Sequence, residues 1–326
     1  MKEHKWFMGL DLSSDRFRGL MAHQTYLSEV MIENRLSHQR DEASRVKELL
    51  RCFHEVRAQS KVTLDDLSGV GIGVPGLVDP ESGTVLYCAR LGWRKFPLKR
   101  LLEQELAIPI LVENDVNLGL YGEACQGAAK GINHVFGVFL VDNGIGGAII
   151  IDGDLYQGPF GYAGEIGHVT MDPHGPLCGC GRHGCLEALA GRLVIVSQAA
   201  LLAARGQAPH LQLEIGTDLA KVTNKELAKA VAAGDKEVEA VLRGAGRWIG
   251  LAVANMINVL NPEAVVLGGG LIAEMPELFL DEVRKAVADH ALPYLKEHTA
   301  IVVGKLKEDA VALGALQAIR ELGPGK

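Results

Sequence analysis

The alternation of apolar and polar positions in the first third of the chain predicts strands and helices that follow one another. Residues 6–12 and 16–22 are expected to form two paired strands joined by a polar turn. The stretch 32–60 contains an amphipathic helix, because four apolar residues recur at helical spacing, Val46, Leu49, Leu50 and Phe53. A strand with a Gly/Pro turn, a further strand and a helix are expected next, at 68–79, 108–115 and 116–129. This alternation predicts an α/β lobe.

A second pattern of the same kind occupies the later part of the chain. A β-hairpin with a Gly-rich connection is expected at 134–157, and helices are expected from about Glu187 onward. The clearest helix is 236–260, which has an apolar stripe at helical spacing and ends at Asn261-Pro262. The last strands and the last helix are expected at 264–270, 300–304 and 310–320.

Both halves of the chain open with a strand–turn–strand unit, at Gly9 and at Val135. A chain of 326 residues is long enough for two domains, or for one domain with two lobes. We therefore expect two similar α/β lobes with a cleft between them.

Charge and hydropathy argue against several classes of function. The net charge is −7 and no basic stripe stands out, so the composition gives no support for binding to nucleic acid or to an anionic membrane. The apolar residues after Lys5 are too few for a signal peptide, and no apolar run approaches membrane-spanning length. We expect a cytoplasmic protein.

Three of the six cysteines lie close together in a segment rich in Gly and Pro, which also contains histidines. The candidate ligands in this segment are His168, Cys178, Cys180 and Cys185. Four such side chains on one loop suit a closed tetrahedral Zn²⁺ site, and the alternative is a set of free thiols. The other three cysteines, Cys52, Cys88 and Cys125, are scattered among apolar residues, which is not the pattern of a disulfide framework. Short spacing of cysteines in an intracellular chain therefore favours the metal.

His174 and His183 lie near His168 in the sequence and remain alternative ligands. Because protein side chains would fill all four positions, the predicted zinc is structural rather than water-activating. We expect it to stiffen the loop that carries Glu165 and Glu187.

Asn114 and Asp115 end one predicted strand, where open α/β lobes bind their ligands. A carboxylate in that position can take a proton from a substrate hydroxyl, and a neighbouring amide can orient the hydroxyl. The alternative for Asp115 is a helix N-cap, and Glu165 and Glu187 can equally be solvated acids or loop caps. Together the four side chains suit a polyhydroxylated ligand.

These motifs resemble those of the ROK family of bacterial sugar kinases and sugar-responsive repressors. The stretch "VDNGIGGAIIIDGDLYQGPFGYAGEIGH", residues 141–168, is similar to the family signature. The zinc segment and the stretches "GVPGLVD", "ENDVN" and "VVLGGG" also look like their family counterparts and occur in the expected order. The resemblance covers essentially the whole chain.

The resemblance implies an α/β fold of the two-lobed, actin-like ATPase type that the family shares with hexokinase. The N-terminal lobe would comprise residues 1–117 and about 308–326, because the C-terminal helix would return to it. The C-terminal lobe, about 118–307, would carry the zinc loop. The family and the long helix 236–260 favour a homodimer.

The resemblance also implies roles for individual residues. Asp115 matches the general base that deprotonates the sugar 6-hydroxyl for attack on the γ-phosphate of ATP, with Mg²⁺ neutralising charge. Sugar-contact positions are matched by Gly76, Asn114, Asp115, Glu165, His168 and Glu187, of which His168 is also a zinc ligand. The adenosine-side loop is matched by Gly268, Gly269 and Gly270, whose alternative is an ordinary strand-to-helix turn.

The first phosphate loop departs from the kinase pattern of the family, which is Asp-x-Gly-Gly-Thr-Lys. This chain has Asp11-Leu12-Ser13-Ser14-Asp15-Arg16 at the corresponding positions. Asp11, which would face Mg²⁺ through water, is retained, and the serines can still present hydroxyls. Asp15 sets a negative charge near the phosphates unless Mg²⁺ or Arg16 offsets it.

The second phosphate loop is altered as well. Asp142 and Asn143 stand where the family kinases have Gly and Thr, although Gly144, Gly146 and Gly147 remain. The leading hypothesis is an ATP-dependent kinase for a hexose or an N-acetylhexosamine, with atypical phosphate loops. The second is a catalytically weak or inactive sugar-binding regulator without a DNA-binding domain, since no helix-turn-helix segment precedes the first strand. The third is a kinase with another phosphoryl donor, or with a charged substrate that changes what the pocket needs.

Overall fold

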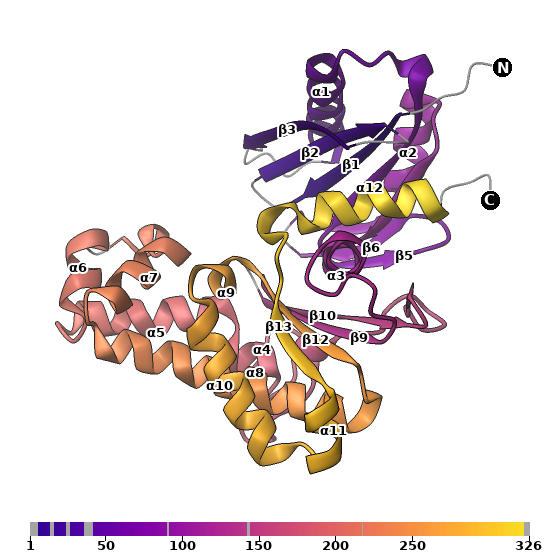
Figure 1. Cartoon of the computed structure of the whole chain (residues 1–326). Helices are drawn as coiled ribbons and strands as arrows, with labels where there is room; N and C mark the ends of the chain where they lie inside the picture. Colours follow the sequence, from indigo (N-terminus) through magenta and orange to yellow (C-terminus); the bar gives the residue numbers. More distant parts are fainter. Residues whose placement is uncertain are drawn as a thin grey trace. The chain divides into compact units, whose positions relative to one another are not determined.

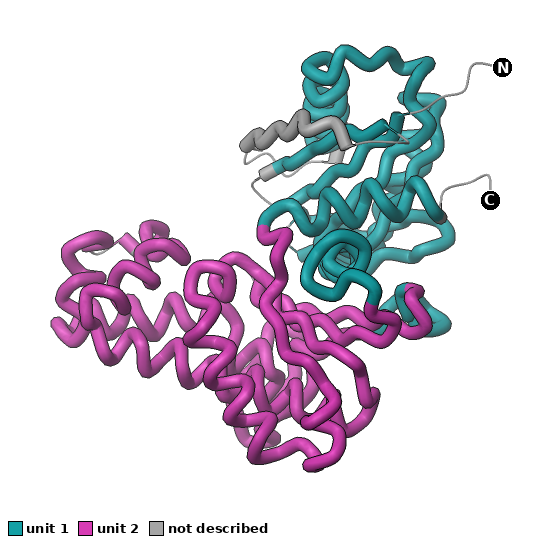
Figure 2. Tube along the Cα trace, viewed as in Figure 1, with its two compact units in different colours: residues 1–131, 155–163, 308–326 teal, residues 132–154, 164–307 magenta. Residues whose placement is uncertain are grey.

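The computed structural model describes residues 6–13, 16–23, 27–35, 42–89, 91–141, 144–216 and 218–322 (Figure 1). The chain divides into unit 1, residues 1–131, 155–163 and 308–326, and unit 2, residues 132–154 and 164–307 (Figure 2). The expected lobe limit at residue 117 falls inside a helix that unit 1 keeps whole, and 155–163 is a part of unit 1 that the sequence did not indicate.

Unit 1 is built on a five-stranded sheet of order β3-β2-β1-β4-β8 and a three-stranded sheet of order β5-β6-β7. Its strands are β1 (Trp6–Leu12), β2 (Arg16–His23), β3 (Leu27–Arg35), β4 (Leu67–Val74), β5 (Leu77–Asp79), β6 (Thr84–Cys88), β7 (Trp93–Phe96) and β8 (Ile110–Asn114). Its helices are α1 (Glu42–Ser60), α2 (Leu98–Leu106), α3 (Asp115–Gln126) and α12 (Ala310–Leu322), with 3-10 helices at Leu64–Asp66 and Lys307–Asp309. The predicted pairing of β1 with β2 is confirmed as antiparallel, whereas β1, β4 and β8 run parallel.

Different helices cover the two faces of the five-stranded sheet (Figure 1). Successive side chains of a strand point to opposite faces, so Met8, Leu10 and Leu12 join the core that includes α1. Gly9 faces α12 instead, and a Cβ there would overlap the carbonyl oxygen of Ala312. Small residues on this face therefore let α12 lie directly against the backbone of the sheet.

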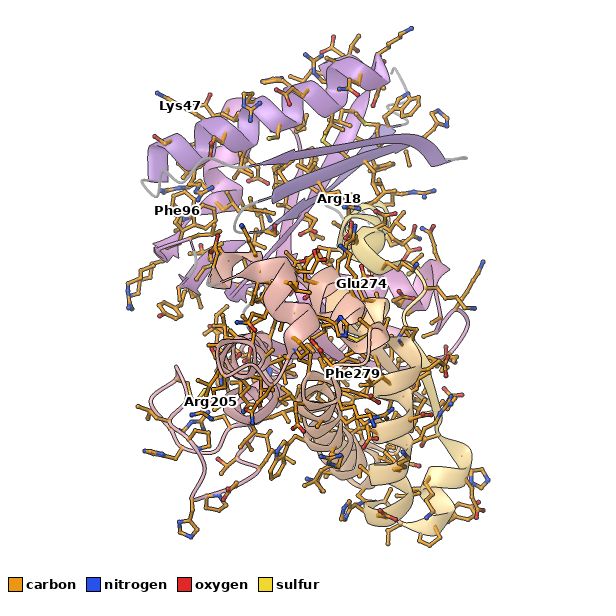
Figure 3. All side chains as sticks on the ribbon, turned by 90° about the vertical axis from the view of Figure 1, so that its left-hand side faces the viewer. Arg18, Lys47, Phe96, Arg205, Glu274 and Phe279 are labelled. Atoms are coloured by element: carbon orange, nitrogen blue, oxygen red, sulfur yellow. The ribbon has the colours of Figure 1, made fainter. Side chains whose placement is uncertain are left out.

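Glycines also bring α12 close to α3. A Cβ at Gly314 would overlap the backbone carbonyl of Leu118, and one at Gly122 would overlap that of Ala310. Arg18, labelled in Figure 3, contributes from β2, because its guanidinium donates to Asp309 at 2.6 Å and to Glu308 at 2.5 Å. Packing and charge together attach α12 to the sheet of unit 1.

Replacing Gly314 by alanine is expected to lower the free energy of unfolding by about 1–3 kcal/mol, because the added methyl group overpacks the helix crossing. The matched control is Gly244→Ala in a helix of unit 2, where the nearest atom to an added Cβ is Arg247 Nη2 at 3.7 Å. Helix propensity alone favours alanine at both positions by up to about 1 kcal/mol. Urea unfolding distinguishes the two effects, and a stabilised Gly314→Ala variant would contradict the close packing.

Unit 2 contains a five-stranded sheet of order β11-β10-β9-β12-β13. Its strands are β9 (Val135–Val141), β10 (Gly144–Ile151), β11 (Asp154–Leu155), β12 (Ala264–Gly268) and β13 (Ala300–Val303). Its helices are α4 (Leu186–Ala190), α5 (Arg192–Ala204), α6 (Pro209–Ile215), α7 (Asn224–Ala232), α8 (Lys236–Leu260), α9 (Gly270–Glu274), α10 (Pro276–His290) and α11 (Pro293–His298), with 3-10 helices at Ile166–His168 and Leu219–Lys221. An antiparallel hairpin followed by two parallel strands repeats the arrangement in unit 1, as the two strand–turn–strand units predicted.

Helix α8 has the bounds that its apolar stripe predicts. It packs against α10, whose Phe279 (labelled in Figure 3) is fully buried in the core of unit 2. The helix ends because Asn261 adopts a left-handed conformation with φ 48°, and its N–H bonds to the carbonyl of Ile257. Pro262 follows and cannot continue the helix.

Among the described residues, one stretch has the length and composition of a membrane-spanning helix, contrary to the expectation of none. This stretch, Leu186–Ala204, has 19 residues. In the structure it is two helices, α4 and α5, separated at Gly191, and it contributes Leu186 and Ile195 to the core of unit 2. Core helices meet the same criteria, so the stretch is weak evidence for a membrane span.

Candidate functional site

Parallel strands bring several predicted site residues to one edge of the sheet in unit 1. Asp11 on β1 pairs with Gly73 on β4, and Val74 on β4 pairs with Asn114 on β8. Gly76 follows β4 in the turn beyond that strand, so polar side chains and a glycine turn lie at the ends of these three strands. Ligands of open α/β sheets bind at such carboxyl ends, where backbone and side-chain groups converge.

Asn114 forms the N-cap of α3 and contacts the turn after β4. Its Oδ1 accepts hydrogen bonds from the N–H groups of Val116 at 2.9 Å and Asn117 at 3.1 Å, and its Nδ2 donates to the Gly76 carbonyl at 3.0 Å. Gly76 has φ 97°, and a Cβ there would overlap the carbonyl of Tyr87, so this turn requires glycine. The helix cap is therefore Asn114 and not Asp115, which was the alternative.

Asp115 is the first residue of α3. Its Oδ1 accepts a hydrogen bond from the N–H of Val116 at 2.9 Å, and the residue is half-buried. The positive end of the helix dipole favours a carboxylate at this position. The junction of β8 and α3 thus presents the Asp115 carboxyl group beside the Asn114 amide, whose orientation is fixed by its hydrogen bonds.

The four predicted metal ligands converge in unit 2. Their ligand atoms, from His168, Cys178, Cys180 and Cys185, all lie within 4.8 Å of one another. The His168 Nδ1 to Cys178 Sγ distance is 3.7 Å, and the Cys180 Sγ to Cys185 Sγ distance is 3.6 Å. Tetrahedral zinc, with Zn–S of about 2.3 Å and Zn–N of about 2.0 Å, separates its ligand atoms by about 3.6–3.8 Å. The donor set therefore fits zinc in both chemistry and spacing.

The other two histidines of the segment point elsewhere. His183 Nδ1 lies 3.1 Å from the Gly175 carbonyl, and neither His183 nor His174 belongs to the converging group.

The cysteines of the group differ in pKa. Hydrogen bonds from the backbone and side chain of Arg182 lower the pKa of Cys180 to about 6, which favours the thiolate that metals bind. Burial raises the pKa of Cys178 to about 12.

Two predicted sugar-contact residues lie beside the predicted metal ligands. His168 Nε2 is 3.9 Å from Glu165 Oε2, and Cys178 Sγ is 3.8 Å from Glu187 Oε1. Desolvation raises the pKa of Glu165, and the nearby Glu187 carboxylate adds to this effect while His168 opposes it. A Cβ at Gly144 would overlap the Glu187 carboxylate, so this glycine makes room for the acid. The structure thus brings Glu165, His168 and Glu187 together within unit 2.

The predicted phosphate loops are described only in part. Ser13 directly follows β1, and Gly144 and Gly146 lie in β10. Outside the described residues lie Ser14, Asp15 and Asn143, together with the side chain of Arg16. Their proposed contacts with phosphate therefore stay predictions.

The three glycines of the predicted adenosine-side loop form the turn from β12 to α9. Gly269 has φ 101°, and a Cβ there would overlap the carbonyl of Leu140. A Cβ at Gly268 would overlap the ring of Phe139, and one at Gly270 would lie 2.8 Å from Asn224 Nδ2. This packing explains the glycines without a ligand, so nucleotide binding there also stays a prediction.

Comparison with known proteins identifies the family. The ROK family model matches residues 22–321. The chain belongs to the ROK family. Its glucokinase relative from Halalkalibacterium halodurans is 30% identical over 95% of this chain and 93% of that protein. The xylose repressor of Caldicellulosiruptor bescii is also 30% identical, over 96% of this chain and 77% of the repressor.

Comparison with solved structures identifies the fold of this ROK protein. A ROK family glucokinase from Streptomyces griseus, solved in complex with glucose and AMPPNP, has a TM-score of 0.84 and 29% identity. The match covers 96% of this chain and 98% of the glucokinase. The α/β fold of the actin-like ATPase type and the resemblance to the ROK family are both confirmed.

Proposed function

We propose that this ROK protein is a sugar kinase that transfers the γ-phosphoryl group of ATP to the 6-hydroxyl of a hexose or an N-acetylhexosamine. The observation that carries the proposal is the β8–α3 junction, where Asn114 caps the helix, bonds to Gly76 and fixes the position of Asp115. The similarity to glucokinases over nearly their whole length supports the same assignment.

In the proposed reaction, the Asp115 carboxylate accepts the proton of the sugar hydroxyl. The hydroxyl oxygen then attacks the γ-phosphorus while the bond to the ADP oxygen breaks. Asn114 uses one N–H on Gly76, and its second N–H can donate to the sugar. Mg²⁺, faced by Asp11 through water, would neutralise the phosphate charge.

We also propose that the four converging ligands hold a structural zinc ion. With Nδ1 on the metal, His168 directs Nε2 toward Glu165, as metal-bound histidines commonly do with a carboxylate. Zinc would then fix the orientation of two sugar-contact acids, Glu165 and Glu187. We further propose that the protein is cytoplasmic and forms a homodimer. Light scattering tests the oligomeric state.

A sugar-binding regulator without phosphoryl transfer is the second candidate. The specific observation in its favour is that both phosphate loops differ from the kinase pattern, at Ser13-Ser14-Asp15 and at Asp142-Asn143. The similarity to xylose repressors agrees with it. A kinase that uses a phosphoryl donor other than ATP would explain the same differences.

Thermal unfolding with a panel of hexoses and amino sugars, with and without Mg-ATP, tests the proposal together with an assay of ADP release. A sugar that binds the folded state raises the melting temperature whether or not catalysis occurs. The kinase predicts both a sugar-dependent shift and turnover. A shift without turnover of ATP on any sugar would contradict the ATP-dependent kinase and support the regulator. Formation of sugar phosphate with polyphosphate in place of ATP would identify another donor.

A further inference from the structure

A buried acid lies two residues before the proposed base and has no role in the chemistry described so far. Glu113 is the penultimate residue of β8 and is only 7% exposed. Its Oε1 accepts hydrogen bonds from the Asn114 N–H at 2.8 Å and from Asn117 Nδ2 at 2.9 Å, and its Oε2 accepts one from Gln157 Nε2. Burial raises the pKa of this carboxyl group, while the three hydrogen bonds oppose the rise.

The first two donors lie on either side of Asp115. Asn114 precedes it at the helix cap, and Asn117 belongs to the first turn of α3. One oxygen of Glu113 therefore bonds to the backbone N–H of Asn114 before the proposed base and to the side chain of Asn117 after it.

The third donor comes from a distant part of the chain. Gln157 belongs to the segment 155–163, which is part of unit 1 although unit 2 surrounds it in the sequence. The segment also packs against the end of β5, where Gly161 leaves no room for a Cβ beside Pro80. The bond between Gln157 and Glu113 therefore connects this segment to the β8–α3 junction.

We propose that Glu113 is a positioning residue for Asp115, which acts by bonding the helix cap, the first turn of α3 and Gln157 into one buried network. This inference rests on the proposed function, because it assumes that Asp115 is the base. Displacing a catalytic group by about 1 Å can lower a rate by about 10²-fold, so a network of this kind affects kcat more than substrate affinity.

An exchange of the two side chains tests the network. The substitution Gln157→Glu places a second carboxylate next to the buried carboxylate of Glu113, and the repulsion between them should disrupt the network. Glu113→Gln combined with Gln157→Glu restores a pairing of one amide with one carboxylate in the reversed order. The control is Glu123→Gln, which changes a 1% exposed acid of α3 that accepts a hydrogen bond from the Ala128 N–H, away from Asp115.

We expect Gln157→Glu to lower kcat for sugar phosphorylation by about 10–100-fold with the sugar KM changed less than about threefold. The double variant should recover most of the lost kcat, and Glu123→Gln should keep the wild-type value. An unchanged kcat in Gln157→Glu would overturn the proposal. So would a double variant that recovers the melting temperature but not kcat.

Amide hydrogen exchange separates this test from that of the proposed function. Gln157→Glu should speed exchange in residues 114–117 and 155–163 together, and the double variant should slow both again. If the wild type phosphorylates no sugar, the proposed function fails and, with it, the role of Glu113 toward a base. If the wild type is active but exchange in the two segments does not change together, only the positioning role fails.

Discussion

Replacement of Asp115 by alanine is expected to lower kcat for sugar phosphorylation by roughly 10²–10⁴-fold, the usual contribution of a general base. Sugar affinity should change only a few fold, because the contacts from Asn114 and the Gly76 turn do not depend on the carboxylate. An ADP-release assay measures kcat, and calorimetric titration with the sugar measures affinity.

Two further variants sharpen this test. Asp115→Asn keeps the side-chain shape and can still accept the hydrogen bond of Val116, but it removes the base, so it should be as inactive as alanine. Asp79→Asn changes an acid of β5 that bonds to Ser82 and the Glu81 N–H, and it should keep the wild-type kcat. Wild-type turnover in Asp115→Asn would show that another group accepts the proton.

Replacement of Cys185 by serine is expected to abolish zinc binding and to weaken sugar binding. Cys185 is fully buried, and its Sγ lies 3.6 Å from that of Cys180, so its loss removes one of four ligands from a closed site. Without the metal, His168 no longer fixes Glu165. Ligand binding at 100 times its Kd stabilises a fold by about 2.7 kcal/mol, so added zinc should raise the unfolding temperature of the wild type alone.

The matched control for this loss is Cys52→Ser, a fully buried cysteine of unit 1 outside the cluster. It should retain zinc by elemental analysis, even where the buried hydroxyl lowers stability. A chelator should reproduce the loss of sugar affinity in the wild type and leave the affinity of Cys185→Ser unchanged. Full zinc content in Cys185→Ser would contradict the proposed ligand set.

The elements predicted well are those whose signal lies within one stretch of sequence. Helix α8 is an example, because a single apolar stripe spans it and Asn261-Pro262 terminates it. The three-stranded sheet of β5, β6 and β7 was missed, since strands of three to five residues are too short to show a period. β3 was missed because apolar and charged residues mix in it without a regular period, and because its last residues fall in the stretch 32–60, where a helix was expected.

In the candidate site, too, the residues that could be predicted are those whose signal lies within one stretch of sequence. The convergence of His168, Cys178, Cys180 and Cys185 could be predicted because their short, unusual spacing signals it, and the strand end at Asn114 marked the junction with α3. Glu113 was overlooked although it stands in the same motif, because its partner Gln157 is 44 positions away. Only the folded chain shows that 155–163 belongs to unit 1, since that assignment depends on contacts such as the one between Gly161 and Pro80.

The contact of α12 with the glycine-lined face of unit 1 has a consequence for synthesis. About 180 residues separate Gly131 from Ala310, so the ribosome must make all of unit 2 before α12 can dock. At typical translation rates this delay lasts roughly ten to forty seconds. During that time the backbone at Gly9 and Gly71 lacks the helix that covers it in the finished protein. Newly made unit 1 is therefore expected to depend on chaperones that shield apolar surface until translation is nearly complete.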